Sequence, residues 1–403
     1  MRILYFADIR FPLERANGIQ TFETCHALAR RGHHVRLVVR PDTASPRRDP
    51  FEFYGKAPEE RLVVDSLPVG GLPAMRRATW IAMALGRAVT GRGADIAVTR
   101  DLGLASVILR LPRQLRPRLV YESHGFAPAV GASLDELLTG VAAASSRKQR
   151  RLARREARVW ARADAYVTIT RGLAGELASR YGNRSRLAVI PDGVSLREGT
   201  VAPPMIRHDP PVVGYAGHLY PWKGVDVLLD AIARLPGVQG AIVGGLAGEP
   251  DLERTRRQAR ELGIDGRVRF AGAVAPPQVA PLLAEMDVLV LPNTATHVSA
   301  RYTSPLKLFE YMAAGRPVVA SALPALQEVL HHEANALLVT PGNAIEMAEA
   351  IARLLGDPSL AARLAGAAWC DVHDYRWERR AERLEELFAS MGVASKGARG
   401  AIA

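Results

Sequence analysis

Residues 301–317 read RYTSPLKLFEYMAAGRP, an order of residue types that defines a short helix followed by a strand. Ser304 is a good N-cap residue, and Pro305 suits the first helical position because the N–H that it lacks is not needed there. Gly315 suits the left-handed residue that follows a helix, and Pro317 cannot continue one. The segment therefore predicts a helix of roughly three turns with both ends marked.

The first turn of this helix favours a bound anion. Free N–H groups at a helix N-terminus attract negative charge, and Lys307 in that turn opposes the helix dipole unless a phosphate lies there. Glu310 stands beside apolar residues on a short helix and needs a polar partner, which ribose hydroxyls would provide. The simpler alternatives are a solvated lysine and a structural salt bridge. The segment predicts a nucleotide diphosphate site.

Length and composition indicate a folded two-domain protein. The chain has 403 residues, of which 48% are hydrophobic, enough for two packed cores. Cys25 and Cys370 cannot form a disulfide framework, and the sequence opens on a strand instead of a signal peptide. No apolar run approaches the ~20 residues of a membrane-spanning helix. We expect a cytoplasmic protein, with a peripheral position on the inner face of the cytoplasmic membrane as one option.

The positive charge is confined to the first half of the chain. Residues 1–200 carry 33 Lys and Arg against 19 Asp and Glu, whereas residues 201–403 carry 20 against 22. Two segments, Arg147–Arg162 and Leu72–Arg87, are basic and nearly free of acids. An anionic membrane surface suits such segments, and a solvated helix face is the alternative. Nucleic acid is not expected as a partner, because no nucleic-acid-binding signature is present.

Short apolar runs alternate with amphipathic helical stretches in both halves of the chain. This pattern predicts parallel sheets covered by helices on both faces. In the stretch that begins at Val225, apolar residues recur at a period near 3.6 and predict such a helix. The predicted strands are Ile3–Ala7, Val35–Val39, Leu62–Val64, Ile96–Val98, Leu119–Tyr121, Tyr166–Ile169, Leu187–Ile190, Val212–Ala216, Ala241–Val243, Val268–Phe270, Val288–Leu291, Val318–Ala320 and Ala336–Val339.

Two Rossmann-like domains joined by a linker follow from this pattern. The linker, residues 197–211, contains two Pro-Pro pairs and no apolar periodicity. We expect an N-terminal Rossmann-like domain over residues 1–196 and a C-terminal Rossmann-like domain over residues 212–375. Residues 376–403 form a C-terminal helix and tail, for which a return to the N-terminal domain is one option. Ligands bind beyond the carboxyl ends of such strands, so the two sheets are expected to face one another across a cleft.

Two loops of the second half bear on the ligand. After the predicted strand Val212–Ala216 comes GHLYPWKG, residues 217–224, which offers backbone N–H groups, a histidine and a lysine to a diphosphate. After Ala241–Val243 comes a glycine-rich stretch whose spacing does not match a dinucleotide fingerprint. The first loop supports a diphosphate site, and the second disfavours hydride transfer.

Taken together, these segments resemble the retaining glycosyltransferases of family four, which have the GT-B fold. The resemblance implies that the N-terminal domain is on the acceptor side and that the C-terminal domain binds the nucleotide sugar. The resemblance runs from the loop at Asn17 and Gly18 to the region of Trp377. It implies that Lys223 binds the donor diphosphate, and that Glu310 binds the ribose. In YESHG, residues 121–125, His124 matches the active-site histidine near the donor sugar. By resemblance, Asn17 and Gly18 lie in a loop that closes toward the diphosphate and the acceptor. The implied donor site comprises Gly217, His218, Lys223, Gly224, Tyr302, Ser304, Pro305, Leu306, Lys307 and Glu310.

Two positions depart from the family pattern. His218 stands where the family commonly has an arginine, so its charge depends on pH and its reach is shorter. Tyr302 stands where the family often has a glutamate that contacts the donor sugar. The resemblance therefore implies the reaction and leaves the sugar open.

The reaction implied is retaining transfer of a sugar from a nucleotide diphosphate sugar to a hydroxyl of a glycan or lipid-linked acceptor. Such enzymes serve bacterial-type cell-surface polysaccharide or glycolipid synthesis. The chain has no Asp-x-Asp motif, so neither a metal nor another cofactor is expected. Two alternatives remain, namely a GT-B nucleotide-sugar epimerase and a non-catalytic basic binding protein.

Overall fold

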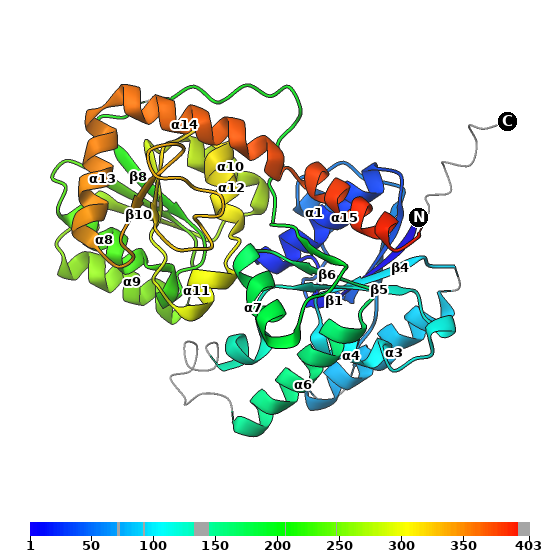
Figure 1. Ribbon diagram of the computed structural model, residues 1–403. Helices are drawn as coiled ribbons and strands as arrows, with labels where there is room; N and C mark the ends of the chain where they lie inside the picture. The colour runs from blue at the N-terminus through cyan, green and yellow to red at the C-terminus, as the bar shows by residue number, and fades with distance from the viewer. Residues whose placement is uncertain (71–72, 92, 133–144, 206, 247, 394–403) are drawn as a thin grey trace. The chain divides into compact units, whose positions relative to one another are not determined.

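The protein consists of two compact units, each built on one parallel β-sheet (Figure 1). The computed structural model describes residues 1–70, 73–91, 93–132, 145–205, 207–246 and 248–393. The first unit is Met1–Asp192 together with the chain from Trp377 onward, and the second is Gly193–Arg376. The α/β class predicted from the sequence is confirmed.

The first unit has a seven-stranded sheet in the order β3-β2-β1-β4-β5-β6-β7. Its strands are β1 (Arg2–Arg10), β2 (His34–Arg40), β3 (Leu62–Ser66), β4 (Ile96–Thr99), β5 (Arg118–Ser123), β6 (Ala165–Thr168) and β7 (Leu187–Val189). Its helices are α1 (Ala16–Arg30), α2 (Pro50–Phe53), α3 (Pro73–Thr90), α4 (Leu102–Ile108), α6 (Ser146–Arg162), α7 (Arg171–Tyr181) and α15 (Trp377–Ser390), with a 3-10 turn η1 (Arg113–Leu115). Each strand pairs with its neighbours in parallel, as connections through helices require.

The second unit has a six-stranded sheet in the order β10-β9-β8-β11-β12-β13. Its strands are β8 (Val212–Ala216), β9 (Gln239–Val243), β10 (Val268–Gly272), β11 (Val288–Leu291), β12 (Val318–Ser321) and β13 (Leu337–Val339). Its helices are α8 (Val225–Ala233), α9 (Pro250–Glu261), α10 (Pro276–Ala284), α11 (His297–Tyr302), α12 (Leu306–Ala313), α13 (Ala344–Gly356) and α14 (Pro358–Val372), with 3-10 turns η2 (Pro221–Lys223), η3 (Asp265–Arg267) and η4 (His373–Tyr375).

All the strands predicted from apolar runs are present, and their ends differ by only a few residues. The central strand β11 shows why short, uninterrupted apolar runs become buried strands. Val288 and Val290 pack into one core cluster, and Leu289 and Leu291 pack into another. Successive side chains of a strand point to opposite faces, so a strand that is apolar at every position requires helices on both faces of its sheet.

The helix predicted at residues 304–315 is shorter than expected. α12 begins at Leu306, and its N-cap is Pro305, which has an extended backbone and provides no side-chain cap. The assignment of Ser304 as the N-cap is therefore wrong by one residue. An N-cap residue needs no helical N–H and takes an extended ψ, both of which proline can satisfy. The end of the helix is as predicted, because Gly315 has a positive φ of 63°.

The C-terminal helix α15 belongs to the first unit and packs against α1. Trp377, Arg380 and Leu384 are buried on its inner face. On its outer face Glu385 and Glu382 form ion pairs with Arg31, at 2.8 and 3.0 Å. Residues 394–403 of the predicted tail lie outside the described residues, as does Leu72 of the predicted basic segment.

Candidate functional site

In the second unit, the point where the strand order reverses lies between β8 and β11. Ligands of open parallel sheets bind beyond the carboxyl ends of the strands at such a point. The loop after β8 and the loop after β11 meet here, because the Thr294 N–H donates to the carbonyl of Trp222 at 3.2 Å. The helix α12 joins the same place, since the Ala216 N–H at the end of β8 donates to the hydroxyl of Tyr311 at 2.7 Å.

Two lysines lie close together at this edge of the sheet. Lys307 is buried, its Nζ has no hydrogen-bond partner among the described residues, and it lies 3.9 Å from the centre of the Tyr215 ring. Burial, reinforced by the charge of Lys223 and opposed by Glu310, lowers the pKa of Lys307 well below its usual range. Burial also lowers the pKa of Lys223 to about 8. An anion bound here would stabilise the charged forms of both lysines and raise their pKa values.

Glycines allow the loops around these lysines to approach one another. Gly217 has a φ of 140°, and a Cβ atom there would lie 3.6 Å from Nζ of Lys307. A Cβ on Gly244, which follows β9, would lie 1.9 Å from the carbonyl oxygen of Gly217. Gly224 has a left-handed φ of 70° and precedes α8, and a Cβ there would lie 1.9 Å from the carbonyl oxygen of Pro292. Gly224 and Gly244 are needed because backbone approaches backbone there, whereas glycine suits position 217 because of its positive φ.

The loop that carries Lys223 is ordered by a stack of aromatic rings. His218 stacks on Tyr220 at 5.1 Å between ring centres, and Tyr220 stacks on Trp222 at 4.6 Å. The hydroxyl of Tyr215 donates to the carbonyl of His218 at 2.6 Å and closes the turn. His218 thus lies in the predicted loop, with its ring in the stack.

The remaining donor-site residues predicted from the sequence lie on α11, on α12 and in the connection between them. Glu310 is half-buried on α12, in electrostatic contact with Lys307. Ser304 is half-buried just before α12. Tyr302 ends α11 and is 3% exposed, with its ring edge-on to His297 at 5.4 Å. The structure therefore gathers Gly217, Lys223 and Lys307 at one place and buries Tyr302.

In the first unit, the strand order reverses between β1 and β4. Arg100, which directly follows β4, donates from Nη1 to Oδ1 of Asn17 at 3.0 Å and to Oε1 of Gln20 at 2.7 Å. Asn17 and Gly18 form the first turn of α1, so their assignment to a loop is wrong. Gly18 packs closely at this helix start, since a Cβ there would lie 2.3 Å from the carbonyl oxygen of Leu13.

His124 lies beyond the end of β5, next to a buried carboxylate. Its Nε2 is 2.6 Å from Oε1 of Glu122, which also accepts from Nε2 of Gln20 at 2.7 Å and pairs with Nη2 of Arg380 at 2.7 Å. Burial would raise the pKa of Glu122, but Arg380 and His124 hold it well below its usual range. Burial and the charge of Arg100 lower the pKa of His124, whereas Glu122 raises it.

The sequence identified His124 but missed the groups around it. Glu122 is only two residues away in the sequence. A charged residue inside an apolar strand needs a partner when it is buried, so its presence could have indicated a functional group. Gln20, Arg100 and Arg380 gave no local signal, because their positions depend on how α1, the end of β4 and α15 pack.

Glu122, His124 and Asp192 form a cluster whose potential metal-ligand atoms lie within 4.8 Å of one another. Oε1 of Glu122 already has the guanidinium of Arg380 at 2.7 Å. A fixed cation on the same oxygen opposes a second cation, so we assign no metal to this cluster.

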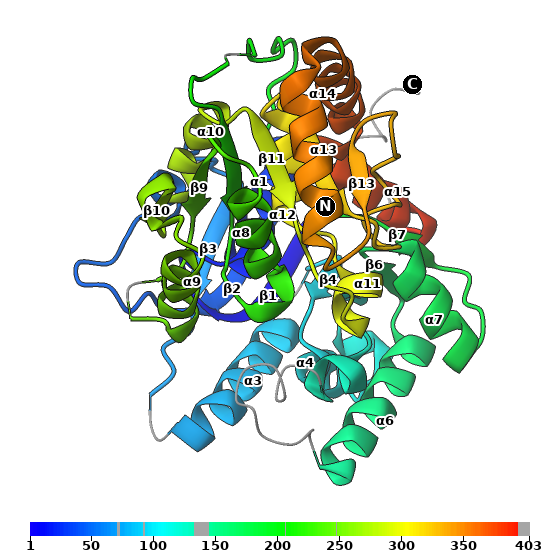
Figure 2. The same cartoon turned by 90° about the vertical axis from the view of Figure 1, so that its left-hand side faces the viewer.

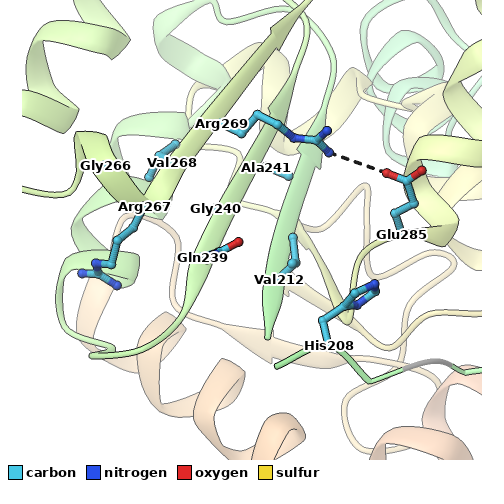
Figure 3. A pocket seen from close by; sticks show the side chains of 10 residues that line it. All are labelled: His208, Val212, Gln239, Gly240, Ala241, Gly266, Arg267, Val268, Arg269 and Glu285. Carbon is cyan, nitrogen blue, oxygen red and sulfur yellow. Dashed lines mark ion pairs between the residues drawn. The ribbon is translucent and has the colours of Figure 1, made fainter. Parts of the chain in front are cut away.

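A cavity of about 340 Å³ lies elsewhere in the second unit (Figure 3). It is lined by Val212, Gln239 and Val268, the first residues of β8, β9 and β10, so it lies at the amino ends of these strands. Arg269 and Glu285 form an exposed ion pair at its rim, at 3.7 Å. The cavity is therefore at the opposite edge of the sheet from Lys223 and Lys307.

Comparison with known proteins agrees with this arrangement. Residues 18–198 match the family described as Glycosyltransferase Family 4, and residues 210–357 match Glycosyl transferases group 1. The chain belongs to these glycosyltransferases, since the two matches together cover most of it.

Individual relatives align with only part of this chain, at modest sequence identity. D-inositol 3-phosphate glycosyltransferase of Xylanimonas cellulosilytica is 30% identical over 252 residues, which cover 58% of each chain. The lipopolysaccharide core biosynthesis glycosyltransferase LpsE of Rhizobium meliloti is 36% identical over 159 residues, which cover 39% of this chain and 43% of LpsE. The chain thus spans less than two thirds of the length of these curated relatives.

Among solved structures, HepE of Anabaena in complex with UDP-glucose has a TM-score of 0.70 at 22% identity, with 97% of this chain and 100% of that one covered. This likeness identifies the GT-B fold that the sequence predicted.

Proposed function

We propose that the protein transfers a sugar from a nucleotide diphosphate sugar to a hydroxyl of a glycan or lipid-linked acceptor, with retention of the anomeric configuration. The observation that carries this proposal is the buried Nζ of Lys307, which lacks a hydrogen-bond partner among the described residues and lies near Lys223 at the switch point of the second sheet. A diphosphate would supply the negative charge that two neighbouring ammonium groups need.

In this proposal, Lys223 and Lys307 stabilise the diphosphate as it leaves. Such stabilisation of developing charge is the largest contribution in many active sites. The backbone N–H groups that begin α12 add to it, and Glu310 binds the ribose hydroxyls. HepE was crystallised with UDP-glucose, which supports UDP-sugars as the first donors to test.

The bond between the anomeric carbon and the diphosphate oxygen breaks, and the acceptor oxygen bonds to the same face of that carbon. The acceptor proton passes to the departing phosphate oxygen. His124 contacts the transferred sugar, as its position in the family pattern implies. We propose no metal in this step, because Lys223 and Lys307 can balance the charge of the diphosphate.

We further propose that the enzyme acts at the cytoplasmic membrane, in the synthesis of a cell-surface polysaccharide or glycolipid. LpsE is named for lipopolysaccharide core biosynthesis, which supports this setting. No helix in the described part of the chain has the length and apolar character needed to cross a bilayer. The association that we propose is peripheral, through a basic surface.

The basic surface that could contact anionic lipid is formed mainly by α6. Helices α3, α4 and α6 lie side by side (Figure 2). The acid of α6, Glu156, is buried and accepts hydrogen bonds from the Tyr166 hydroxyl at 2.7 Å and the Ala127 N–H at 2.9 Å. The outer face of α6 is therefore basic. In contrast, Trp80 of α3 is buried in the core, so α3 presents less apolar surface than its composition suggested.

Thermal unfolding with UDP, GDP and ADP, and then with their sugars, tests the donor assignment. A ligand at 100 times its dissociation constant stabilises by about 2.7 kcal/mol. Incubation of the stabilising sugar nucleotide with and without candidate glycan acceptors then tests transfer. Consumption of donor without acceptor would indicate an epimerase, and no response to any nucleotide would indicate a non-catalytic binding protein.

A further inference from the structure

The carboxylate of Glu122 determines which nitrogen of His124 carries the proton. An ionised carboxylate only accepts hydrogen bonds, and Oε1 of Glu122 lies 2.6 Å from Nε2 of His124. The proton therefore belongs on Nε2. The neutral ring then has a lone pair on Nδ1, which can accept a hydrogen bond. The side chain of His124 is 20% exposed, and that of Glu122 is fully buried.

Arg380 keeps this carboxylate ionised and fixed. Its Nη2 pairs with Oε1 of Glu122 at 2.7 Å, and its Nη1 donates to the carbonyls of Ile190 and Pro191 at 2.8 and 2.7 Å. Its Nε donates to the hydroxyl of Thr24 at 3.1 Å. The guanidinium is thus held by α1, by the segment after β7 and by β5, although it comes from α15.

We propose that Glu122 and Arg380 are positioning residues that hold His124 in its Nε2–H tautomer and present Nδ1 as a hydrogen-bond acceptor for a substrate hydroxyl. The C-terminal helix α15 is then part of the active-site machinery and not only a support for the first unit. The proposal rests on the proposed function of His124, which contacts the transferred sugar.

The arrangement has the logic of a buried acid that orients a histidine. Such an acid selects one tautomer and fixes the ring plane, and loss of the partner that orients a metal-binding histidine typically costs about 10–100-fold in affinity or activity. Here Glu122 also needs the positive charge of Arg380, because a buried carboxylate without a cation would become protonated or move out of the site. Arg100 and Asp192 are the other charged groups near the ring.

Nitrogen NMR of the full chain with labelled histidine rings tests the tautomer directly. The chain has 10 histidines, and the His124→Gln spectrum assigns the signals of His124. We expect a protonated Nε2 and an unprotonated Nδ1 near pH 7.5. A protonated Nδ1 with a bare Nε2 would overturn the proposal, whatever the enzyme's activity.

Kinetics with two variants test the positioning role. Glu122→Gln should lower kcat by about 10–100-fold and leave the KM for donor within about twofold, because it removes the charge and keeps the shape. Arg380→Met alone leaves the buried carboxylate of Glu122 without its cation, which destabilises the fold. The double variant of Arg380→Met and Glu122→Gln avoids this problem because it removes both charges together. The double variant should fold and should show the same loss of kcat with mixed tautomers. Wild-type kcat in the folded double variant would refute the positioning role.

Arg379→Met is the matched control, because this neighbouring arginine of α15 is 49% exposed and pairs with Glu382 on the surface. It should keep the wild-type kcat. Arg380→Lys should restore part of the activity lost in Arg380→Met. His124→Ala tests the proposed role of His124 separately from the tautomer. Wild-type transfer in that variant would contradict the contact of His124 with the sugar, whereas the tautomer is measured by NMR on the wild-type protein.

Discussion

Replacement of Lys307 by methionine should stabilise the ligand-free protein and weaken nucleotide binding. Methionine has a similar length, is unbranched and suits a helix as well as lysine does. It removes a buried Nζ that has no hydrogen-bond partner in the described part of the chain. The same Nζ is the group that we expect to meet the diphosphate, so stability and binding should change in opposite directions.

The size of each effect follows from the contacts of Lys307. An unsatisfied buried polar group lowers the free energy of unfolding by about 1–3 kcal/mol, which the variant regains. Loss of the cation–π contact with the Tyr215 ring, at 3.9 Å, offsets this gain by about 0.5–2 kcal/mol. The net gain should be about 1 kcal/mol, which raises Tm by about 2–4 °C for a unit of this size. Loss of a charge-assisted bond of about 1.5–3 kcal/mol should raise Kd for the nucleotide about 10–150-fold.

Thermal unfolding without ligand and calorimetry with the nucleotide that binds best measure both quantities. Arg257→Met is a suitable control, because this arginine of the second unit is 63% exposed and should change neither Tm nor Kd. A lower Tm without ligand, together with an unchanged Kd, would refute the reasoning that places the diphosphate at Lys307.

Four further experiments test the donor site and the basic surface. Lys223→Ala should lose most transfer activity while remaining folded, and near wild-type turnover would contradict its role. The pKa of Lys223 is lowered to about 8 from its usual 10.5. Between these two pH values the unfolded chain binds a proton on Lys223 that the folded protein has lost, so the free energy of unfolding rises with pH over this range. Diphosphate affinity should instead fall as pH rises above about 8, and calorimetry in buffers of different ionisation enthalpy should detect proton uptake on binding. Glu310→Ala should weaken free nucleotide as well as donor, and unchanged nucleotide affinity would remove its ribose role. Vesicles containing phosphatidylglycerol should float with the protein at low salt, less so after Arg151→Glu and Arg154→Glu, and no flotation of the wild type would leave α6 as a solvated face.

Much of the fold could be predicted because it depends on local signals. Each strand is a short apolar run, and α8 buries Val225, Leu228, Leu229 and Ile232 at the spacing expected for one helix face. The end of α12 follows from Gly315, because few residues other than glycine adopt its positive φ. The start of α12 was off by one residue, since serine and proline both suit the positions at a helix start.

The donor site was also largely visible in the sequence. Gly217, Gly224 and Lys223 lie within one short loop, so their types and order carry most of the information about it. The burial of Lys307 against Tyr215 was not visible, because the two residues come from different elements. The aromatic stack that orders the Lys223 loop was hidden for a different reason: alternate residues of a loop stack only when its backbone turns suitably.

By itself, the sequence determined the class of fold, the family and the loop that carries Lys223. These features depend on periodicity, caps and glycines within about one element's length of chain. Only the tertiary structure decided the surroundings of His124. Gln20 and Glu122 are 102 residues apart in the chain and form a hydrogen bond of 2.7 Å, and Arg380 reaches the same oxygen from α15. Parallel strands are joined through helices, so residues that are neighbours at the end of a sheet are distant in sequence, and no local pattern records that they meet.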